Sequence, residues 1–210
     1  MDEEKEYYAL VKKAFDVLAP FYDVVALPIE GVRDKVVDFT NARDGSTILD
    51  VATGTGKQAF AFAKRGYDVI GIDLTESMLR IARKNNENGL VKFEVGDATH
   101  LRFEENSFDV SCVSFALHDM PLTIRERVLK EMVRVTKSNG TLVIVDYALP
   151  ENKVGRFLIY RLVSFYEGEY YRKFIASDLE VLLGETGIEI KVQLPILLGA
   201  GRILKGIKVQ

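Results

Sequence analysis

The chain has 210 residues, 48% of them hydrophobic, and its 28 basic and 31 acidic side chains give a formal net charge of −3. That length and composition suit one domain with a sizeable core and exclude a wholly disordered protein. The near-balanced charge gives no general attraction to nucleic acid, so none is expected as a partner. A single cysteine, Cys112, excludes an internal disulfide and a four-cysteine zinc site.

No apolar stretch approaches the ~20 residues of a membrane-spanning helix. The chain opens on acidic residues rather than on the apolar segment of a signal peptide. We therefore expect a cytoplasmic protein.

The chain opens with an amphipathic helix, in which apolar side chains recur every three or four residues up to Pro20. A second helix is expected at about 29–41. Capping boxes predict two later helix starts, one at Thr123 with Glu126 and one at Ser177 with Glu180. From residue 46 onward, apolar segments alternate with helical ones, and the expected strands are 46–52, 67–73, 91–96, 108–115, 141–147 (after an Asn139-Gly140 turn), 188–194 and 202–209.

Alternating apolar strands and helices predict an α/β fold, in which a doubly wound, mainly parallel seven-stranded sheet of the Rossmann-like kind is covered on both faces. We expect a single domain made of four parts. These are an N-terminal helical lid (1–42), a cofactor-binding core (43–150), an aromatic cap after the fifth strand (151–176) and a C-terminal helix with two strands (177–210). Such sheets bind ligands beyond the carboxyl ends of their strands.

The first strand is followed by a glycine-containing loop. Gly54 and Gly56 stand where a missing side chain lets a ligand approach backbone N–H groups. Asp50, inside an apolar strand, needs a partner such as a ligand ammonium group or backbone amides. A Walker phosphate loop is excluded, because Val51 and Gln58 occupy positions that require Gly and Ser or Thr. The G-x-G-x-x-A fingerprint of dinucleotide-binding proteins, at residues 54–59, stays open.

Further acids follow the next strands. Asp73 ends the second strand, where a carboxylate can accept both ribose hydroxyls of an adenine nucleoside, and Leu74 could pack on the base. Asp97, after the third strand, could accept a hydrogen bond from an adenine amino group. The segment SFALHDM, residues 114–120, follows the fourth strand and would pass the reactive end of a bound cofactor.

These features together resemble a known family. Residues 50–56 are similar to the acid-x-Gly-x-Gly-x-Gly motif of class I S-adenosylmethionine (SAM)-dependent methyltransferases, with Ala52 in place of the first glycine. Residues 71–79, 95–111 and 130–146 resemble the later motifs of the same family. The FYD segment at residues 21–23 resembles the ubiquinone/menaquinone biosynthesis branch. The resemblance covers about residues 15–150. It becomes weaker after Pro150, in the part of the chain where such enzymes select their substrates.

The resemblance implies SAM as cofactor and S-adenosylhomocysteine as product. Asp50 and the loop at 52–56 would hold the methionine end, Asp73 the ribose, and Asp97 with Ala98 the adenine amino edge. Tyr22 would reach over the cofactor from the lid, although ordinary lid packing of Tyr22 and core packing of Met78 stay open. The implied cofactor-binding set is Tyr22, Asp50, Ala52, Thr53, Gly54, Thr55, Gly56, Asp73, Leu74, Met78, Asp97, Ala98, Ser114 and Phe115.

Methyl transfer mainly requires alignment of nucleophile, methyl group and sulfur. A base is needed only where the acceptor must lose a proton. His118 and Asp119 are the candidate catalytic residues, although His118 could also be a loop histidine bonded to backbone. No metal site is predicted.

The acceptor side is expected in an aromatic segment. Seven of the chain's 21 aromatic residues lie between Phe157 and Phe174, with basic residues among them. A cap there would form an apolar pocket from Tyr160, Tyr166, Tyr170 and Tyr171, unless these residues only pack a helical cap. The acceptor would be a small, partly apolar molecule (quinone-like, phenolic or lipid-like), reached by peripheral membrane contact if it is lipophilic. The oligomeric state is not predicted.

Two other functions compete with this interpretation. One is an NAD-dependent oxidoreductase that uses residues 54–59, against which Asp50, Asp97 and the short chain argue. The other is a SAM-binding protein without transferase activity, which the sequence alone does not separate from an enzyme.

Overall fold

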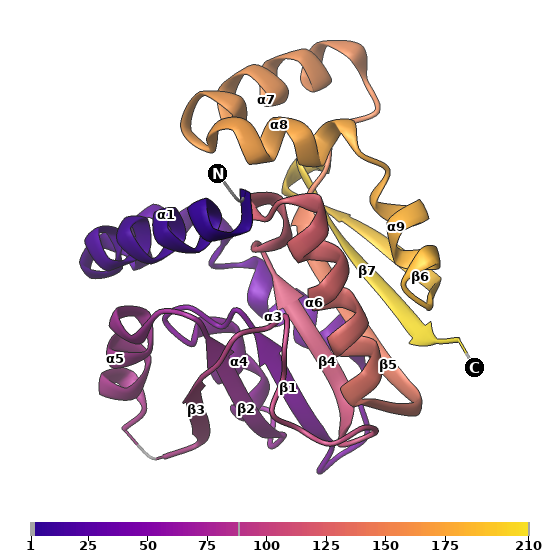
Figure 1. Ribbon diagram of the computed structural model, residues 1–210. Coiled ribbons are helices and arrows are strands. Elements are labelled where there is room, and N and C mark those ends of the chain that lie inside the picture. Colours follow the sequence, from indigo (N-terminus) through magenta and orange to yellow (C-terminus); the bar gives the residue numbers. More distant parts are fainter. Residues whose placement is uncertain (1–2, 88, 210) are drawn as a thin grey trace.

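The computed structural model describes residues 3–87 and 89–209, apart from the side chains of Glu3 and Tyr166. Its centre is a seven-stranded sheet in the order β3-β2-β1-β4-β5-β7-β6 (Figure 1). The first five strands are parallel, and β7 runs antiparallel to both β5 and β6. The predicted mainly parallel sheet is confirmed. The strands are β1 (Thr47–Val51), β2 (Asp68–Asp73), β3 (Val91–Val95), β4 (Phe108–Ser114), β5 (Thr136–Tyr147), β6 (Ile188–Ile196) and β7 (Gly201–Lys208).

Helices cover both faces of the sheet, because the central strands are apolar on both sides. One core cluster joins the sheet to α3, α4 and α5, and a second joins the other face to α6, α9 and parts of α1 and α8. The helices are α1 (Glu3–Leu18), α2 (Tyr22–Val25), α3 (Val32–Thr40), α4 (Lys57–Ala63), α5 (Glu76–Asn85), α6 (Leu122–Val135), α7 (Lys153–Tyr166), α8 (Gly168–Ala176) and α9 (Leu179–Glu185).

Two predicted helix starts are wrong in detail. Helix α6 begins at Leu122, directly after Pro121 and without a side-chain cap, so Thr123 already lies within its first turn. Helix α9 is capped by Asp178, whose carboxylate accepts the N–H groups of Glu180 and Val181. The hydroxyl of Ser177 instead donates to the carbonyl of Phe174 in α8. A charged carboxylate one residue later takes the capping position from the serine.

The fifth strand also starts earlier than predicted. Strand β5 begins at Thr136, and Asn139, with φ +67°, lies inside it. The pairing with β4 shifts register between Phe108 and Val110. The Asn139-Gly140 pair therefore makes a bulge within the strand rather than a turn before it.

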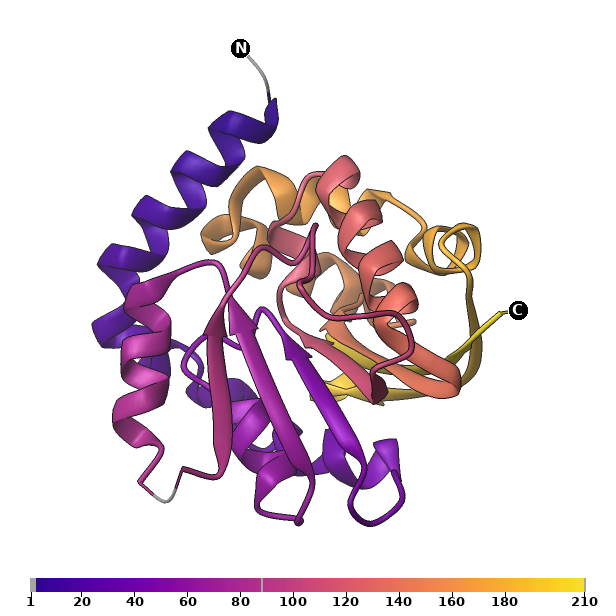
Figure 2. The ribbon, with the colours of Figure 1, turned by 60° about the horizontal axis from the view of Figure 1, so that its bottom comes forward.

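The N-terminal segment and the cap meet at the carboxyl ends of the parallel strands. Helix α1 and the α7–α8 cap lie at that end of the sheet (Figure 1), and α1 runs beside α5 (Figure 2). Tyr7 of α1 contacts Tyr170 of α8 edge to face, with ring centroids 6.0 Å apart. In the described part of the chain, no helix has the length and apolar character needed to cross a bilayer.

Candidate active site

The loop after β1 has the left-handed backbone that its glycines allow. Gly54 has φ +56° and Gly56 φ +79°, and a Cβ on Gly56 would lie 2.6 Å from the ring of Phe93. Ala52 also has a positive φ, +54°. This conformation costs a residue with a side chain ~1–2 kcal/mol. Replacing the first glycine of the motif with Ala52 therefore keeps the shape of the loop at the expense of local strain.

Asp73, at the end of β2, fastens this loop. Its carboxylate accepts hydrogen bonds from the N–H groups of Gly54 and Thr75, both at 2.8 Å. Burial raises the pKa of Asp73, and the two backbone bonds oppose that shift. A carboxylate has about four acceptor sites, so Asp73 could also accept from a hydroxyl group of a ligand.

A cleft opens beyond Asp73. Its walls include nine residues of the predicted cofactor set, which are Tyr22, Ala52, Gly54, Asp73, Leu74, Met78, Asp97, Ala98 and Phe115. Helix α1 closes one side with Tyr7, Tyr8, Val11 and Phe15. The hydroxyl group of Tyr8 is 3.1 Å from that of Thr99, which in turn donates to Asp97. The lid helix is thereby attached to the loop after β3.

A second, smaller cavity continues from the first past Tyr22, Ala52 and Phe115, which line both. Asp50, Thr53, Thr55 and Ser114 of the predicted set line it. Gly56 lines neither cavity and instead starts helix α4. Arg33 and Lys57, which the sequence analysis missed, add two cations to the walls. Acid and cations together suit the ammonium and carboxylate groups of an amino acid.

Asp50 is 1% exposed and accepts a hydrogen bond from the hydroxyl group of Thr53 at 2.5 Å. Burial raises the pKa of Asp50 to about 7. A ligand ammonium group stabilises the ionised carboxylate, so binding below that pKa must release a proton. If the ligand is SAM, as the sequence resemblance implies, its Kd should fall about tenfold between about pH 6 and about pH 8. Isothermal titration calorimetry at both pH values measures this change.

The variant Asp50→Asn is the control for this pH dependence. It has no proton to release, so its weaker binding should be nearly independent of pH over the same range. A pH-independent Kd in the wild-type protein would contradict the role given to Asp50.

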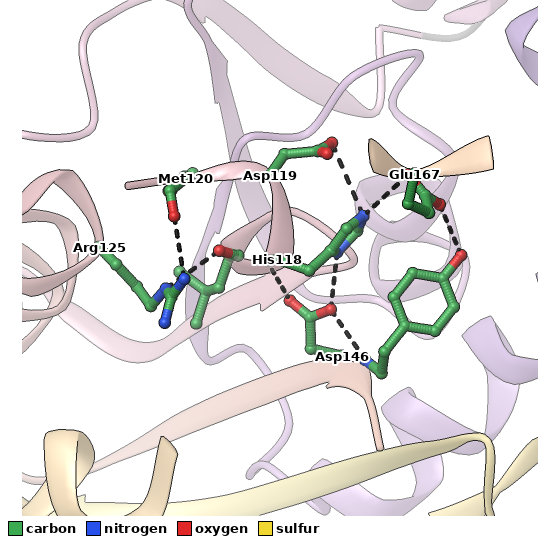
Figure 3. A network of polar contacts seen from close by, with 8 residues as sticks. His118, Asp119, Met120, Arg125, Asp146 and Glu167 are labelled. Carbon is green, nitrogen blue, oxygen red and sulfur yellow. Dashed lines mark hydrogen bonds and ion pairs between the residues drawn. The ribbon is translucent and has the colours of Figure 1, made fainter. Parts of the chain in front are cut away.

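A polar cluster lies beside the cleft, around His118 of the Leu117–Asp119 turn after β4 (Figure 3). The Nδ1 atom of His118 is 2.7 Å from Asp146 at the end of β5. Its Nε2 atom is 3.6 Å from Oδ2 of Asp119 and 3.5 Å from Oε2 of Glu167. Tyr147 donates its hydroxyl proton to Glu167 at 2.8 Å. The two candidate catalytic residues are therefore neighbours, and Asp119 lines the cleft.

The charges in this cluster shift one another's pKa. Burial alone would lower the pKa of His118, but the carboxylates of Asp146, Asp119 and Glu167 outweigh it and raise that pKa well above its usual value. Burial raises the pKa of Asp119 to about 6, against the attraction of His118. Burial would also raise the pKa of Glu167, but its contacts with His118 and Tyr147 lower it.

The sequence analysis gave no role to Asp146, Tyr147, Glu167 or Arg125. Arg125 is 1% exposed, donates to the carbonyl oxygens of Leu117 and Met120, and so shapes the His118 turn. The sequence held a signal for Arg125, because it stands three and four residues before Val128 and Leu129, on the apolar side of the α6 segment. The sequence held no such signal for Glu167, which reaches His118 and Tyr147 only because the cap folds back over the strand ends.

The predicted acceptor residues sit in an aromatic cluster under the cap. Tyr171 is fully buried, and its ring centroid is 5.3 Å from that of Tyr147 and 6.5 Å from that of Tyr160. Tyr160, Tyr170 and Tyr171 do not line the cleft described above. The side chain of Tyr166 lies outside the described residues. Contact of these tyrosines with an acceptor stays a prediction.

Comparison with known proteins relates the chain to methyltransferases. Residues 49–144 match the model of a methyltransferase domain. A demethylmenaquinone methyltransferase of Lactobacillus johnsonii is 31% identical over 227 residues, which cover 94% of this chain and 92% of that protein. The chain belongs to the class I SAM-dependent methyltransferases. The resemblance seen in the sequence is confirmed.

Other relatives of this methyltransferase share its core. The demethylmenaquinone methyltransferase of Paenarthrobacter aurescens is 37% identical over 145 residues, which are 67% of this chain but only 56% of that protein. Among solved structures, the [4+2]-cyclase SpnF has a TM-score of 0.76 at 18% identity, covering 96% of this chain and 97% of that one. A methyltransferase from a Haloferax volcanii Trm112 complex has a TM-score of 0.75 at 18% identity, covering 95% and 98%. At such identities these structures show the fold.

SAM is the cofactor of this methyltransferase, and the two joined cavities fit it. Asp73 offers a carboxylate where a ribose would lie, and Gly54 has no side chain to fill the space beside Met78. Asp50, Arg33 and Lys57 complement an amino-acid end. The comparisons do not favour NAD binding.

Proposed function

We propose that this methyltransferase transfers a methyl group from SAM to a small quinone-type acceptor with an ionisable hydroxyl group. The observation that carries the proposal is the position of Asp119. This carboxylate lines the cleft that also contains Asp73, and it lies next to His118. The names of the relatives, which include demethylmenaquinone methyltransferases, support the acceptor class.

The chain's own residues would mainly bind SAM and the acceptor and orient them. SAM supplies an activated methyl group on a sulfonium. Tyr22 and Phe115 lie where the two cavities meet, so their rings would face that positive charge and contribute ~0.5–2 kcal/mol. Holding donor and acceptor in line can contribute ~7–11 kcal/mol in well-arranged systems.

Asp119 and His118 would act on the acceptor. A quinol becomes a better nucleophile when its hydroxyl group loses a proton, and Asp119, a carboxylate of the cleft wall, would accept that proton. The pKa of Asp119, raised by burial to about 6, suits a base that works near neutral pH. His118, fixed by Asp146, would hold the Asp119 carboxylate in place.

Methyl-labelled SAM and an acceptor panel test the proposal. The panel contains a demethylated naphthoquinol, a simple phenol and a phospholipid, and product formation is followed by mass spectrometry. We expect the label to appear on the naphthoquinol. Tight SAM binding without transfer to any acceptor would favour a SAM-binding protein without transferase activity.

A lipophilic acceptor would be reached at a membrane surface, and α7 suits such a contact. Exposed apolar side chains recur along one side of this helix, including Phe157 (65% exposed) and Phe165 (91%). Its charged residues, Lys153, Arg156 and Arg161, are all basic. Apolar and basic side chains together favour an anionic lipid surface.

Vesicle sedimentation tests this contact. We expect the protein to sediment with vesicles that contain phosphatidylglycerol and less with phosphatidylcholine alone. Replacing both Phe157 and Phe165 with Ser should weaken binding about tenfold or more, because each ring contributes ~1.5–3 kcal/mol when buried. Val181→Ser, an exposed site on α9, is the control. Equal sedimentation of both variants would contradict a role for α7.

A further inference from the structure

The cluster around His118 has the composition of a metal site. Among the described residues, His118, Asp119 and Glu167 form the one group of metal-ligating side chains whose ligand atoms all lie within 4.8 Å of one another. The ligands come from two segments, the turn after β4 and the junction of α7 and α8. Imidazole and carboxylate ligands suit zinc, manganese and related divalent ions.

The two distances from Nε2 of His118 suit ligands of an ion better than partners in a hydrogen bond. Nε2 of His118 lies 3.5 Å from Oε2 of Glu167 and 3.6 Å from Oδ2 of Asp119. A charged N–H···O bond would be ~2.7–2.9 Å long. Two ligands of a tetrahedral ion with bonds of ~2.0–2.1 Å lie roughly 3.3 Å apart.

His118 and Glu167 are each oriented by a second residue. Asp146 accepts from Nδ1 of His118 at 2.7 Å, so Nε2 is the ring nitrogen directed at the two carboxylates, and a bound ion would take the place of its proton. Tyr147 holds the other oxygen of Glu167 at 2.8 Å. Carboxylate–histidine pairs of this kind support metal ligands in many proteins.

The charge balance also favours a cation. Three carboxylates, those of Asp119, Asp146 and Glu167, surround one imidazole. The nearby buried cation, Arg125, donates to the carbonyl oxygens of Leu117 and Met120 and to the hydroxyl group of Ser177 rather than to these carboxylates. Asp146 is buried, and Glu167 and Asp119 are partly buried. A charged imidazole balances only one of the three carboxylates, so a further positive charge among them would be favourable.

We propose that His118 Nε2, Asp119 Oδ2 and Glu167 Oε2 bind a divalent transition-metal ion. Asp119 also lines the cleft, so the remaining coordination position would face it and would be filled by water or by an oxygen of the acceptor. Only that last role rests on the proposed function.

Calorimetry on the metal-free protein tests the ion site without any acceptor. Protein dialysed against EDTA and then against buffer is titrated with Zn²⁺ and, separately, with Mn²⁺. We expect one ion per chain for at least one of the two metals. Co²⁺ should give the visible absorption of a four- or five-coordinate ion that includes a nitrogen ligand.

Two variants and one control assign the ligands. Glu167→Gln keeps an acceptor for Tyr147 and should weaken binding of the metal about 100-fold or more, because even supporting residues contribute 10- to 100-fold. Asp119→Asn should weaken binding of the metal to a similar degree. The side chain of Asp119 is 32% exposed, so this variant should fold even if Glu167→Gln does not. Glu169→Gln, which removes an exposed carboxylate paired with Lys173, should bind as the wild type does.

Absence of saturable binding in the wild-type protein, or wild-type affinity in both variants, would overturn the metal site. Methyl transfer that persists undiminished in EDTA would show that the proposed function stands without an ion. Metal binding without transfer to any acceptor would leave the ion site in place and contradict the proposed function instead.

Discussion

The variant Asp73→Asn should bind SAM about 10- to 100-fold more weakly than the wild-type protein. The loss follows from the charge-assisted hydrogen bonds that the Asp73 carboxylate would make to the ribose, each worth ~1.5–3 kcal/mol. The same carboxylate accepts the N–H groups of Gly54 and Thr75, so its loss also loosens the glycine loop. Calorimetric titration with SAM measures the change in Kd.

Asp68→Asn is the matched control. Asp68 begins the same strand, β2, at the opposite end, where it is exposed. This variant should bind SAM with wild-type affinity. If Asp73→Asn kept its affinity while folding normally, the ribose would lie elsewhere and the assignment of the first cavity would be wrong.

The variant Asp119→Asn should lower kcat by about 10²- to 10⁴-fold and leave the Kd for SAM nearly unchanged. The substitution keeps the shape of the side chain but removes the charge that would accept the acceptor's proton or bind an ion. Single-turnover transfer to the naphthoquinol, with a separate SAM titration, distinguishes the chemical step from cofactor binding.

Glu126→Gln provides the comparison for Asp119→Asn. Glu126 lies in α6, and its carboxylate pairs with Lys130, four residues along the same helix at the surface. The Glu126→Gln variant should have the kcat of the wild-type protein. A kcat for Asp119→Asn within a few-fold of the wild-type value would place the reacting end of the acceptor away from the His118 turn.

The linear sequence by itself determined the fold class and the approximate positions of the parallel strands, and nine of the residues that it predicts for cofactor binding line the cleft. Apolar strands alternating with helices allow few topologies, and parallel strands bring their carboxyl ends to one edge. Asp50 and Asp73 lie in the last residues of their strands, and Gly54 and Asp97 follow a strand closely, so local order along the chain was enough to bring them to one edge of the sheet. The errors lay at element ends, as at Thr123 and Ser177, where neighbouring residues compete for one cap.

The tertiary structure alone decided the cluster around His118. Asp146 ends β5, and Glu167 arrives from the turn between α7 and α8, 49 positions after His118. No periodicity or motif predicts such a meeting, because it depends on how the cap folds back over the strand ends. Helix α1 closes the cleft through a similar long-range contact, the hydrogen bond between Tyr8 and Thr99. Segments far apart in sequence meet there because burial of their apolar faces, and not any local signal, sets their positions.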